Sequence, residues 1–213
     1  MDIAILIYPR FTALDAVGPY DVLSRLPGAR VTFVAEQVGA LRTDTGQLGL
    51  LADAALDDLP NPEIVLVPGG PGQSELMEDG PVHAWLRAAD ATSTWTASVC
   101  TGSLILGAAG LLTGKRATSN WQALDELGGL GAEVVPERVV FDGKYATSAG
   151  VTAGLDMALS LAAKIAGEPV AQAIQLGLEY DPEPPFDAGS PHKAPAEIVE
   201  AVRAYSRFAE NAA

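Results

Sequence analysis

The sequence is poor in the residues that bind metals and form disulfides. Among its 213 residues there are one cysteine, Cys100, and two histidines. A lone cysteine excludes an intrachain disulfide, and with so few histidines beside it a zinc site lacks ligands. We therefore expect no metal and no disulfide framework, which leaves Cys100 as a candidate nucleophile or a buried small hydrophobe.

Positive charge is also scarce. Thirteen Lys and Arg are set against 27 Asp and Glu, the net charge is −14, and the longest basic cluster is Lys115-Arg116. Nucleic acids and anionic membranes are therefore poor partners. No apolar run is long enough to cross a bilayer, and residues 1–8 are too short for a signal peptide. We expect a soluble, cytoplasmic protein that folds as one domain over residues 1–213.

Apolar runs and turn signals predict the strands. A nearly uniform apolar run is typical of a strand covered on both faces, and Asp142-Gly143 is typical of a hairpin turn. The expected strands are residues 3–8, 31–35, 64–67, 95–100, 133–135, 139–142 and 145–148, with short antiparallel or edge segments within 41–52.

Helical periodicity fills the intervals between these strands. The expected helices are residues 12–26, with a possible kink at Gly18-Pro19, 73–77, 82–91, a segment through Leu104 to Leu111, one through Leu124 and Leu127, one from 149–152 through Ile165, 170–178 and 196–209. Their alternation with strands predicts a doubly wound α/β fold with a mostly parallel sheet between helices. The proline-rich segment 179–192 is predicted to be a surface connection, or a cover over a cleft or a partner subunit. His83 is predicted to be solvated.

Cys100 is predicted to stand on a strand-to-helix turn. The strand before it ends at the cysteine, and small residues lead from it into the next helix. Such a turn leaves the backbone N–H groups of Thr101 and Gly102 free, and the helix dipole favours a negative charge there. These features favour a lowered thiol pKa and a nucleophilic thiolate.

Two other segments would join this turn at the carboxyl edge of the sheet. Gly69-Gly70 follows the strand 64–67, and adjacent glycines permit positive φ and free N–H groups that suit developing negative charge. Thr12 to Asp15 has the spacing of a capping box. Asp15 is therefore either a first-turn carboxylate that serves its helix or an acid at the site where α/β folds bind ligands.

Four motifs together carry a family resemblance. They are Val99-Cys100-Thr101-Gly102, Pro68-Gly69-Gly70, Leu14-Asp15-Ala16-Val17-Gly18-Pro19 and Ala149-Gly150-Val151-Thr152-Ala153-Gly154. The chain resembles the ThiJ/PfpI superfamily of class I glutamine-amidotransferase-like, flavodoxin-like folds. Within it the chain is most similar to the isonitrile hydratases, a likeness that extends to the tail 178–191. The resemblance implies a homodimer that uses no cofactor and hydrates an isonitrile, a small molecule, to an N-substituted formamide.

The same resemblance implies roles for particular residues. Cys100 would attack the isonitrile carbon to form a thioimidate, and Asp15 would protonate that carbon and then activate water. The N–H groups of Gly70 and Thr101 would support charge in the pocket, and the turn at Val151 would pack against the thiol. The pair Asn120-Trp121 would line the substrate site.

Two positions depart from the pattern of the superfamily. Relatives commonly have His before the tryptophan, where this chain has Asn120, so a Cys-His protease or amidase mechanism is disfavoured. Similar hydratases often have Gly where this chain has Ala149, and a methyl group there would narrow the pocket or stiffen the next helix.

Two alternatives from other classes stay open. A glyoxalase or deglycase acting on 2-oxoaldehydes would prefer a Glu near the thiol and often a His, so Asp15 and Asn120 weigh against it. A non-catalytic sensor that responds to a ligand or to oxidation of Cys100 would also use a reactive thiol.

Overall fold

A mostly parallel sheet forms the centre of the molecule. The computed structural model describes residues 1–204 and 206, and within that part seven strands form one sheet in the order β10-β11-β7-β6-β1-β2-β5. Their bounds are β1 Asp2–Leu6, β2 Arg30–Ala35, β5 Ala54–Ala55, β6 Ile64–Val67, β7 Trp95–Val99, β10 Val139–Asp142 and β11 Tyr145–Ser148. Every pair is parallel except the β10-β11 hairpin. The predicted fold class is confirmed.

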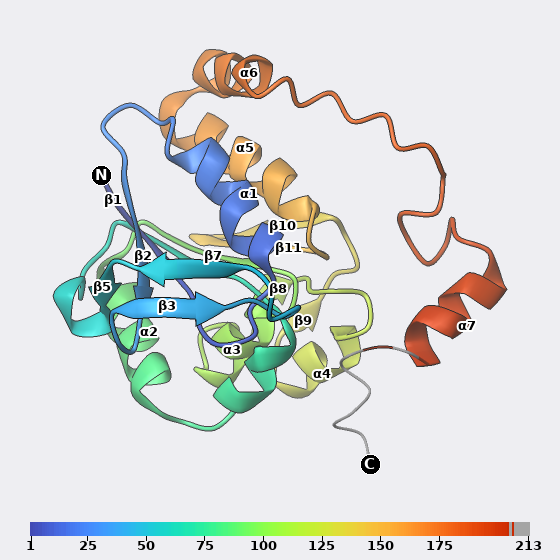
Figure 1. The fold of residues 1–213 in the computed structure, drawn as a ribbon, viewed down its shortest axis with the longest axis horizontal. Helices are drawn as coiled ribbons and strands as arrows, with labels where there is room; N and C mark the ends of the chain where they lie inside the picture. The colour runs from blue at the N-terminus through green and yellow to red at the C-terminus, as the bar shows by residue number, and fades with distance from the viewer. Residues whose placement is uncertain (205, 207–213) are drawn as a thin grey trace.

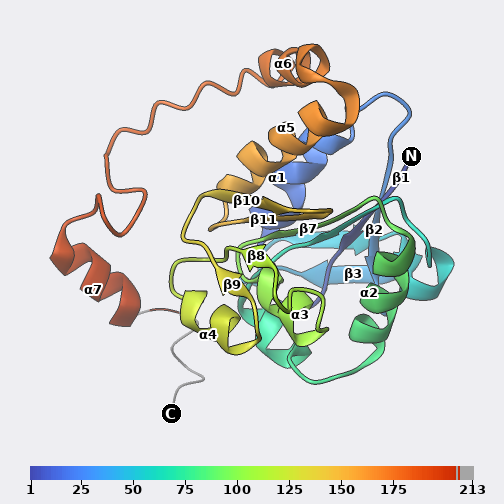
Figure 2. The same cartoon turned by 180° about the vertical axis from the view of Figure 1, so that it is seen from behind.

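Helices cover both faces of this sheet (Figures 1 and 2). On one face lie α1 (Ala13–Leu23), α5 (Ala153–Ala166) and α6 (Glu168–Gly177), and on the other lie α2 (Pro81–Thr92), α3 (Gly102–Ala108) and α4 (Leu124–Gly129). Strand β1 is buried between both layers, and residues 3–6 have no exposed surface. This double covering explains why β1 and β6 are apolar at nearly every position.

Smaller elements complete the described chain. The expected antiparallel pair is present as β3 (Gly39–Arg42) and β4 (Gly49–Ala52), and β8 (Arg116–Ala117) pairs with β9 (Glu133–Val134). Two short 3₁₀ helices, η1 (Leu56–Asp58) and η2 (Pro71–Leu76), lie between strands. No helix in the described part of the chain is both long enough and apolar enough to span a membrane.

Several predicted helix limits are wrong by a few residues. Helix α1 passes through Gly18 and Pro19 without a break and ends at Leu23, and α3 ends at Ala108 instead of Leu111. The predicted helix 196–209 is observed as α7 (Ala196–Ala204), and its positions 205 and 207–209 lie outside the described residues.

The prediction for His83 is also wrong. Its side chain is 1% exposed. Position 83 lies three and seven residues before Leu86 and Asp90, which are also buried, so His83 belongs to the inward face of α2. The Asp79 carboxylate lies 4.0 Å from its Nδ1.

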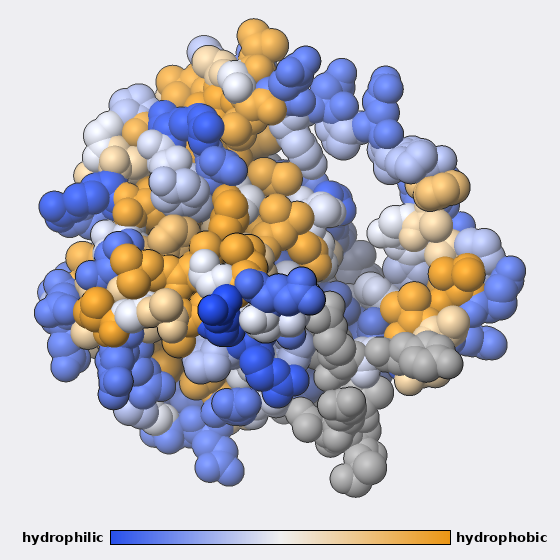
Figure 3. All heavy atoms as spheres, viewed as in Figure 1, coloured by the Kyte–Doolittle hydropathy of each residue, from blue (hydrophilic) through white to orange (hydrophobic). Residues whose placement is uncertain are grey.

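The C-terminal segment stands away from the body. After α6 the chain runs extended and exposed to α7, none of whose residues is buried, and Figure 3 shows an opening between this segment and the rest of the molecule. Tyr180 holds the start of the segment by donating a hydrogen bond to Asp156 Oδ1 at 2.8 Å. The predicted loop 179–192 is therefore mostly exposed in the single chain, its residues 188–191 line a small cleft, and the alternative that it covers a partner subunit stays a prediction.

Candidate active site

Cys100 occupies the turn between β7 and α3, as predicted. Its φ is +57°, a left-handed conformation that few side chains adopt, and the residue is 2% exposed. The turn is tight because Gly102 lies against the end of β6. A Cβ atom at position 102 would meet the Val67 carbonyl oxygen at 2.1 Å, so only glycine fits there.

Three hydrogen-bond donors surround the thiol, yet its pKa is raised. Burial and the nearby charge of Asp15 raise the pKa of Cys100 to about 12, and the N–H groups of Thr101 and Val151 and the side-chain amide of Asn120 oppose this rise. The predicted lowering is wrong because removal from water outweighs the favourable dipoles. The resting site therefore contains a neutral thiol with donors already placed to receive a thiolate.

Asp15 is fully buried beside this thiol. Its Oδ2 accepts a hydrogen bond from the Gly69 N–H at 2.9 Å. Burial raises the pKa of Asp15 to about 7 with help from the charge of Asp44, while hydrogen bonds from Gly69 and the Cys100 thiol lower it. The predicted capping box is wrong, because Asp15 turns toward the glycine loop and the Thr12 hydroxyl donates instead to Asp44 Oδ2 at 2.9 Å.

The glycine loop positions these groups by close backbone packing. Gly70 has φ +133°, as expected, but its N–H donates to the Thr101 hydroxyl at 3.0 Å and is not free. The Gly69 N–H is taken by Asp15. The expectation of a free Gly70 amide is therefore wrong for this structure, and its role toward substrate charge stays a prediction. A Cβ at position 70 would approach Thr12 N to 2.5 Å, and one at position 69 would approach Thr101 N to 2.5 Å.

Asn120 and Trp121 face different neighbours. The side-chain oxygen Oδ1 of Asn120 accepts a hydrogen bond from the Gln122 N–H at 3.0 Å, which leaves the side-chain NH₂ group for the thiol of Cys100. Trp121 instead lies against α7, with the Arg203 guanidinium 5.2 Å from its ring centroid. The structure thus gathers Asp15, Thr101, Asn120 and Val151 around Cys100, and leaves Trp121 outside this cluster.

Two residues absent from the sequence-based prediction also belong to this cluster. Tyr8 is buried, and its hydroxyl donates to the Pro68 carbonyl oxygen at 2.8 Å. Burial and the charges of Asp15 and Cys100 raise the pKa of Tyr8 well above its usual value. Ser119 donates from its hydroxyl to the Cys100 carbonyl oxygen at 3.0 Å, which fixes the turn from outside. Tyr8 lies at the carboxyl end of the first predicted strand, and this position could have identified it from the sequence as a residue of the site.

Several known proteins are similar to this chain in sequence and in fold. The DJ-1/PfpI family model matches residues 1–164. Isonitrile hydratase of Pseudomonas putida is 46% identical over 203 residues, covering 95% of this chain and 89% of that protein. The HTH-type transcriptional regulator CdhR of Pseudomonas aeruginosa is 30% identical over 177 residues, covering 80% of this chain and 52% of the regulator. A ThiJ/PfpI family protein from Pseudomonas syringae has a crystal structure that superposes with a TM-score of 0.92 at 40% identity, over 98% of this chain and 88% of that one.

Proposed function

The chain belongs to the DJ-1/PfpI family, and from this we propose that it is an isonitrile hydratase, which adds water to an isonitrile to give an N-substituted formamide. The observation that supports the proposal most directly is the buried pair of Cys100 and Asp15, which share a site without a histidine. Similarity to the Pseudomonas putida enzyme over nearly the whole chain points the same way.

The first half of the reaction needs a thiol and a base that gives its proton back. Asp15 as carboxylate accepts the Cys100 proton while Sγ bonds to the terminal carbon of the isonitrile. The protonated carboxyl then delivers the same proton to that carbon, so the product is a neutral thioimidate, R–N=CH–S–Cys100. Because Cys100 and Asp15 are both buried, the charge that develops on sulfur meets the Thr101, Val151 and Asn120 donors instead of water.

The second half consumes one water. The Asp15 carboxylate takes a proton from the water as its oxygen attacks the imidate carbon, and then returns that proton to the nitrogen. The C–S bond breaks as the carbonyl forms, the sulfur recovers the hydroxyl proton, and the formamide R–NH–CHO leaves. Each proton starts and ends on a group of the site or on the substrates, and no redox partner is involved.

Two other parts of the proposal come from the family resemblance. We expect a homodimer, and the partly exposed Leu14 (40%) and Tyr20 (36%) on α1 offer apolar surface for it. Analytical ultracentrifugation would give twice the mass of the chain if this is right. A cytoplasmic location, a single domain over residues 1–213 and the lack of a cofactor stay predictions.

The decisive experiment is turnover of one aryl and one alkyl isonitrile, with formamide measured by chromatography. Wild-type protein should produce formamide, whereas Cys100→Ala and Asp15→Asn should lose it by at least about 10³-fold, the scale on which removal of a nucleophile or its base acts. Inert wild-type protein that consumes 2-oxoaldehydes would instead support the glyoxalase or deglycase alternative.

A further inference from the structure

Two adjacent residues of the loop after β8 contact Cys100 at two different atoms. Ser119, which is 1% exposed, donates from its hydroxyl to the Cys100 carbonyl oxygen at 3.0 Å. The side-chain NH₂ group of the next residue, Asn120, donates to the Cys100 thiol. One loop therefore contacts both the backbone and the sulfur of the candidate nucleophile.

The Asn120 side chain is fixed within its own loop. Its Oδ1 accepts a hydrogen bond from the Gln122 N–H at 3.0 Å, and its backbone carbonyl accepts one from the Ala123 N–H at 2.8 Å, an arrangement typical of an Asx turn. On the other side, a Cβ atom at Gly150 would lie 3.1 Å from the Asn120 amide nitrogen. The amide therefore moves with its loop, and its distance from the sulfur depends on where the loop is held.

Two hydrogen bonds hold this loop in place. The Thr118 N–H donates to the Thr147 hydroxyl of β11 at 2.9 Å, and Ser119 donates to the Cys100 carbonyl oxygen. The bond from Ser119 lies one residue closer to the Asn120 amide along the chain. Cys100 itself has a left-handed φ of +57°, a conformation that surrounding contacts must maintain. Ser119 thus joins the position of the loop to the conformation of the cysteine.

We propose that Ser119 is a positioning residue, which holds the Cys100 carbonyl oxygen and thereby fixes the distance at which the Asn120 amide meets the sulfur when the sulfur carries negative charge. For catalysis the inference rests on the proposed function, in which Cys100 attacks the isonitrile carbon. Hydrogen bonds to charged groups are shorter and stronger than those between neutral groups, so a small displacement of the donor matters most in the charged state.

Ser103 supplies a matched control. Its hydroxyl donates to the same Cys100 carbonyl oxygen at 3.2 Å, and the residue is fully buried. Ser103 belongs to α3, however, and not to the loop that carries Asn120. Ser103→Ala and Ser119→Ala therefore remove the same kind of hydrogen bond from the same oxygen, but only Ser119→Ala releases the loop of Asn120.

The first measurement is the rate at which methyl methanethiosulfonate labels Cys100, followed by intact-protein mass spectrometry. Cys100 is the only cysteine in the chain, so labelling reports on this thiol alone. In Ser119→Ala the thiolate population should fall about tenfold, and labelling should slow about threefold, because a more basic thiolate is also more nucleophilic. Loosened packing would expose the thiol and speed labelling instead. Ser119→Thr, which keeps a hydroxyl, should restore nearly the wild-type rate.

A double-mutant cycle identifies the residue through which Ser119 acts. If Ser119 acts through Asn120, Ser119→Ala should slow labelling no further in an Asn120→Ala background. The effect of Ser103→Ala should instead be the same with and without Asn120. Labelling that is unchanged or faster in Ser119→Ala, or that is slowed equally in both backgrounds, would overturn the proposal.

Turnover connects the positioning role to the chemistry. In Ser119→Ala, kcat for an isonitrile should fall about tenfold with KM unchanged, because a donor to developing charge acts in the transition state. An unchanged kcat in an active enzyme would also overturn the proposal. If wild type hydrates no isonitrile, the proposed function fails, and the labelling cycle alone then decides whether Ser119 positions Asn120.

Discussion

The buried pair of Asp15 and Cys100 determines how the site responds to pH. In the proposed mechanism Asp15 must be ionised to accept the thiol proton, and burial raises its pKa to about 7. We predict that kcat/KM rises about tenfold per pH unit below pH 7 and becomes level above it. The pKa of Cys100 is about 12, so no second inflection should occur between pH 8 and 10.

A neighbouring carboxylate supplies the control for this pH profile. The negative charge of Asp44 raises the pKa of Asp15, so Asp44→Asn should move the inflection to lower pH without removing activity. An inflection near pH 8 to 9 that persists in Asp44→Asn would show that thiol ionisation, and not Asp15, controls the rate.

The same carboxyl should make the folded state less stable in its ionised form. The pKa of Asp15 is about 7 in the folded state and 3.8 when unperturbed, so the folded state binds more protons between these values. Stability is therefore lost as pH rises from about 4 to about 7. We predict that Asp15→Asn is more stable than wild type, and that its advantage is about 2 kcal/mol larger at pH 8 than at pH 5.5.

Urea unfolding at the two pH values measures this difference. Asp21→Asn, which changes an exposed carboxylate on the same helix, should show no comparable gain. A pH-independent effect of Asp15→Asn would mean that packing, and not the buried charge, is responsible.

Sequence patterns located the candidate residues Cys100 and Asp15 but not their protonation. Cys100 could be placed on its turn because a strand pattern ends there and a helix pattern begins. Its pKa could not be predicted, because the burial of the thiol and its contact with Asp15 arise from segments 85 residues apart in the chain. The wrongly predicted capping box has the same origin, since the Gly69 amide, in the loop after β6, donates to Asp15.

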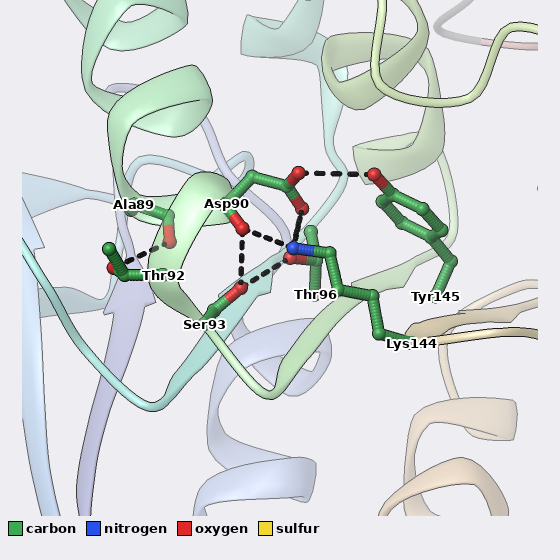
Figure 4. Close-up of polar contacts among 7 residues, drawn as sticks. All are labelled: Ala89, Asp90, Thr92, Ser93, Thr96, Lys144 and Tyr145. Atoms are coloured by element: carbon green, nitrogen blue, oxygen red, sulfur yellow. Dashed lines mark hydrogen bonds and ion pairs between the residues drawn. The ribbon is translucent and has the colours of Figure 1, made fainter.

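Beyond single residues, a partly buried polar cluster joins α2 to the β10-β11 hairpin (Figure 4). Asp90, in the last turn of α2, accepts hydrogen bonds from the hydroxyls of Thr96 at 2.6 Å and Tyr145 at 3.1 Å, and Lys144 Nζ lies 3.1 Å from Oδ1. Lys144 also donates to the Asp90 carbonyl oxygen. A carboxylate opposes the dipole at a helix C-terminus, so the lysine and the two hydroxyls are what make this position tolerable.

Removing the centre of this cluster should be costly. We predict that Asp90→Ala lowers the free energy of unfolding by about 1 to 2 kcal/mol, because it removes the carboxylate that accepts from Thr96 and Tyr145, whereas Lys144 keeps its hydrogen bond to the backbone carbonyl of residue 90. Chemical denaturation followed by circular dichroism gives the value. Asp21→Ala, which breaks the exposed ion pair with Arg25, should cost no more than about 0.5 kcal/mol. Similar losses in both variants would contradict the structural role of the cluster.

The junction of β6 and α3 gives a second prediction at this scale. Gly102→Ala would place a methyl group 2.1 Å from the Val67 carbonyl oxygen. Neither atom can turn away as a flexible side chain would, because the oxygen belongs to the backbone and the methyl group is bonded directly to it. We expect a loss of about 3 kcal/mol in stability and a large loss of turnover, because α3 must shift and move Cys100 with it. Gly129→Ala in α4, where nothing lies within 4 Å of the added atom, should instead stabilise by about 0.5 to 1 kcal/mol. Thermal unfolding of both variants measures the contrast.

Strands of four residues with marked ends were predictable, and the two-residue strand β9 also falls within a predicted strand, 133–135. The strands β6, β10 and β11 have the predicted bounds because apolar runs and turn residues mark both ends. The two-residue strands β5 and β8 contain too few positions for any periodicity, and they form only because neighbouring strands are already in place. The burial of His83 was predicted wrongly for a related reason. Whether a single polar residue on a helix is buried depends on how the helix packs in the folded protein, and not on the polarity of that residue alone.

For the molecule as a whole, the alternation of predicted strands and helices was sufficient to predict the fold class. The strand order was not accessible, because the order in a doubly wound sheet depends on which crossovers occur, and these bring together segments distant in sequence. The course of the C-terminal segment was inaccessible as well. Its proline content predicts an extended chain, but only the structure shows that α7 returns to Trp121.

The excess of negative charge allows a prediction at the same scale. A net charge of −14 on 213 residues means that most surface charges repel one another, and such repulsion destabilises the compact state. Exposed ion pairs such as Arg30 with Asp2 oppose this effect but are individually weak. Salt screens both the repulsion and the ion pairs, and the repulsion involves more charges. We therefore predict that the Tm at pH 7.5 rises by several degrees between 10 mM and 300 mM NaCl. Potassium chloride should act equally, which separates screening from ion-specific effects. A Tm that falls with salt would mean that the ion pairs contribute more to stability than the repulsion removes.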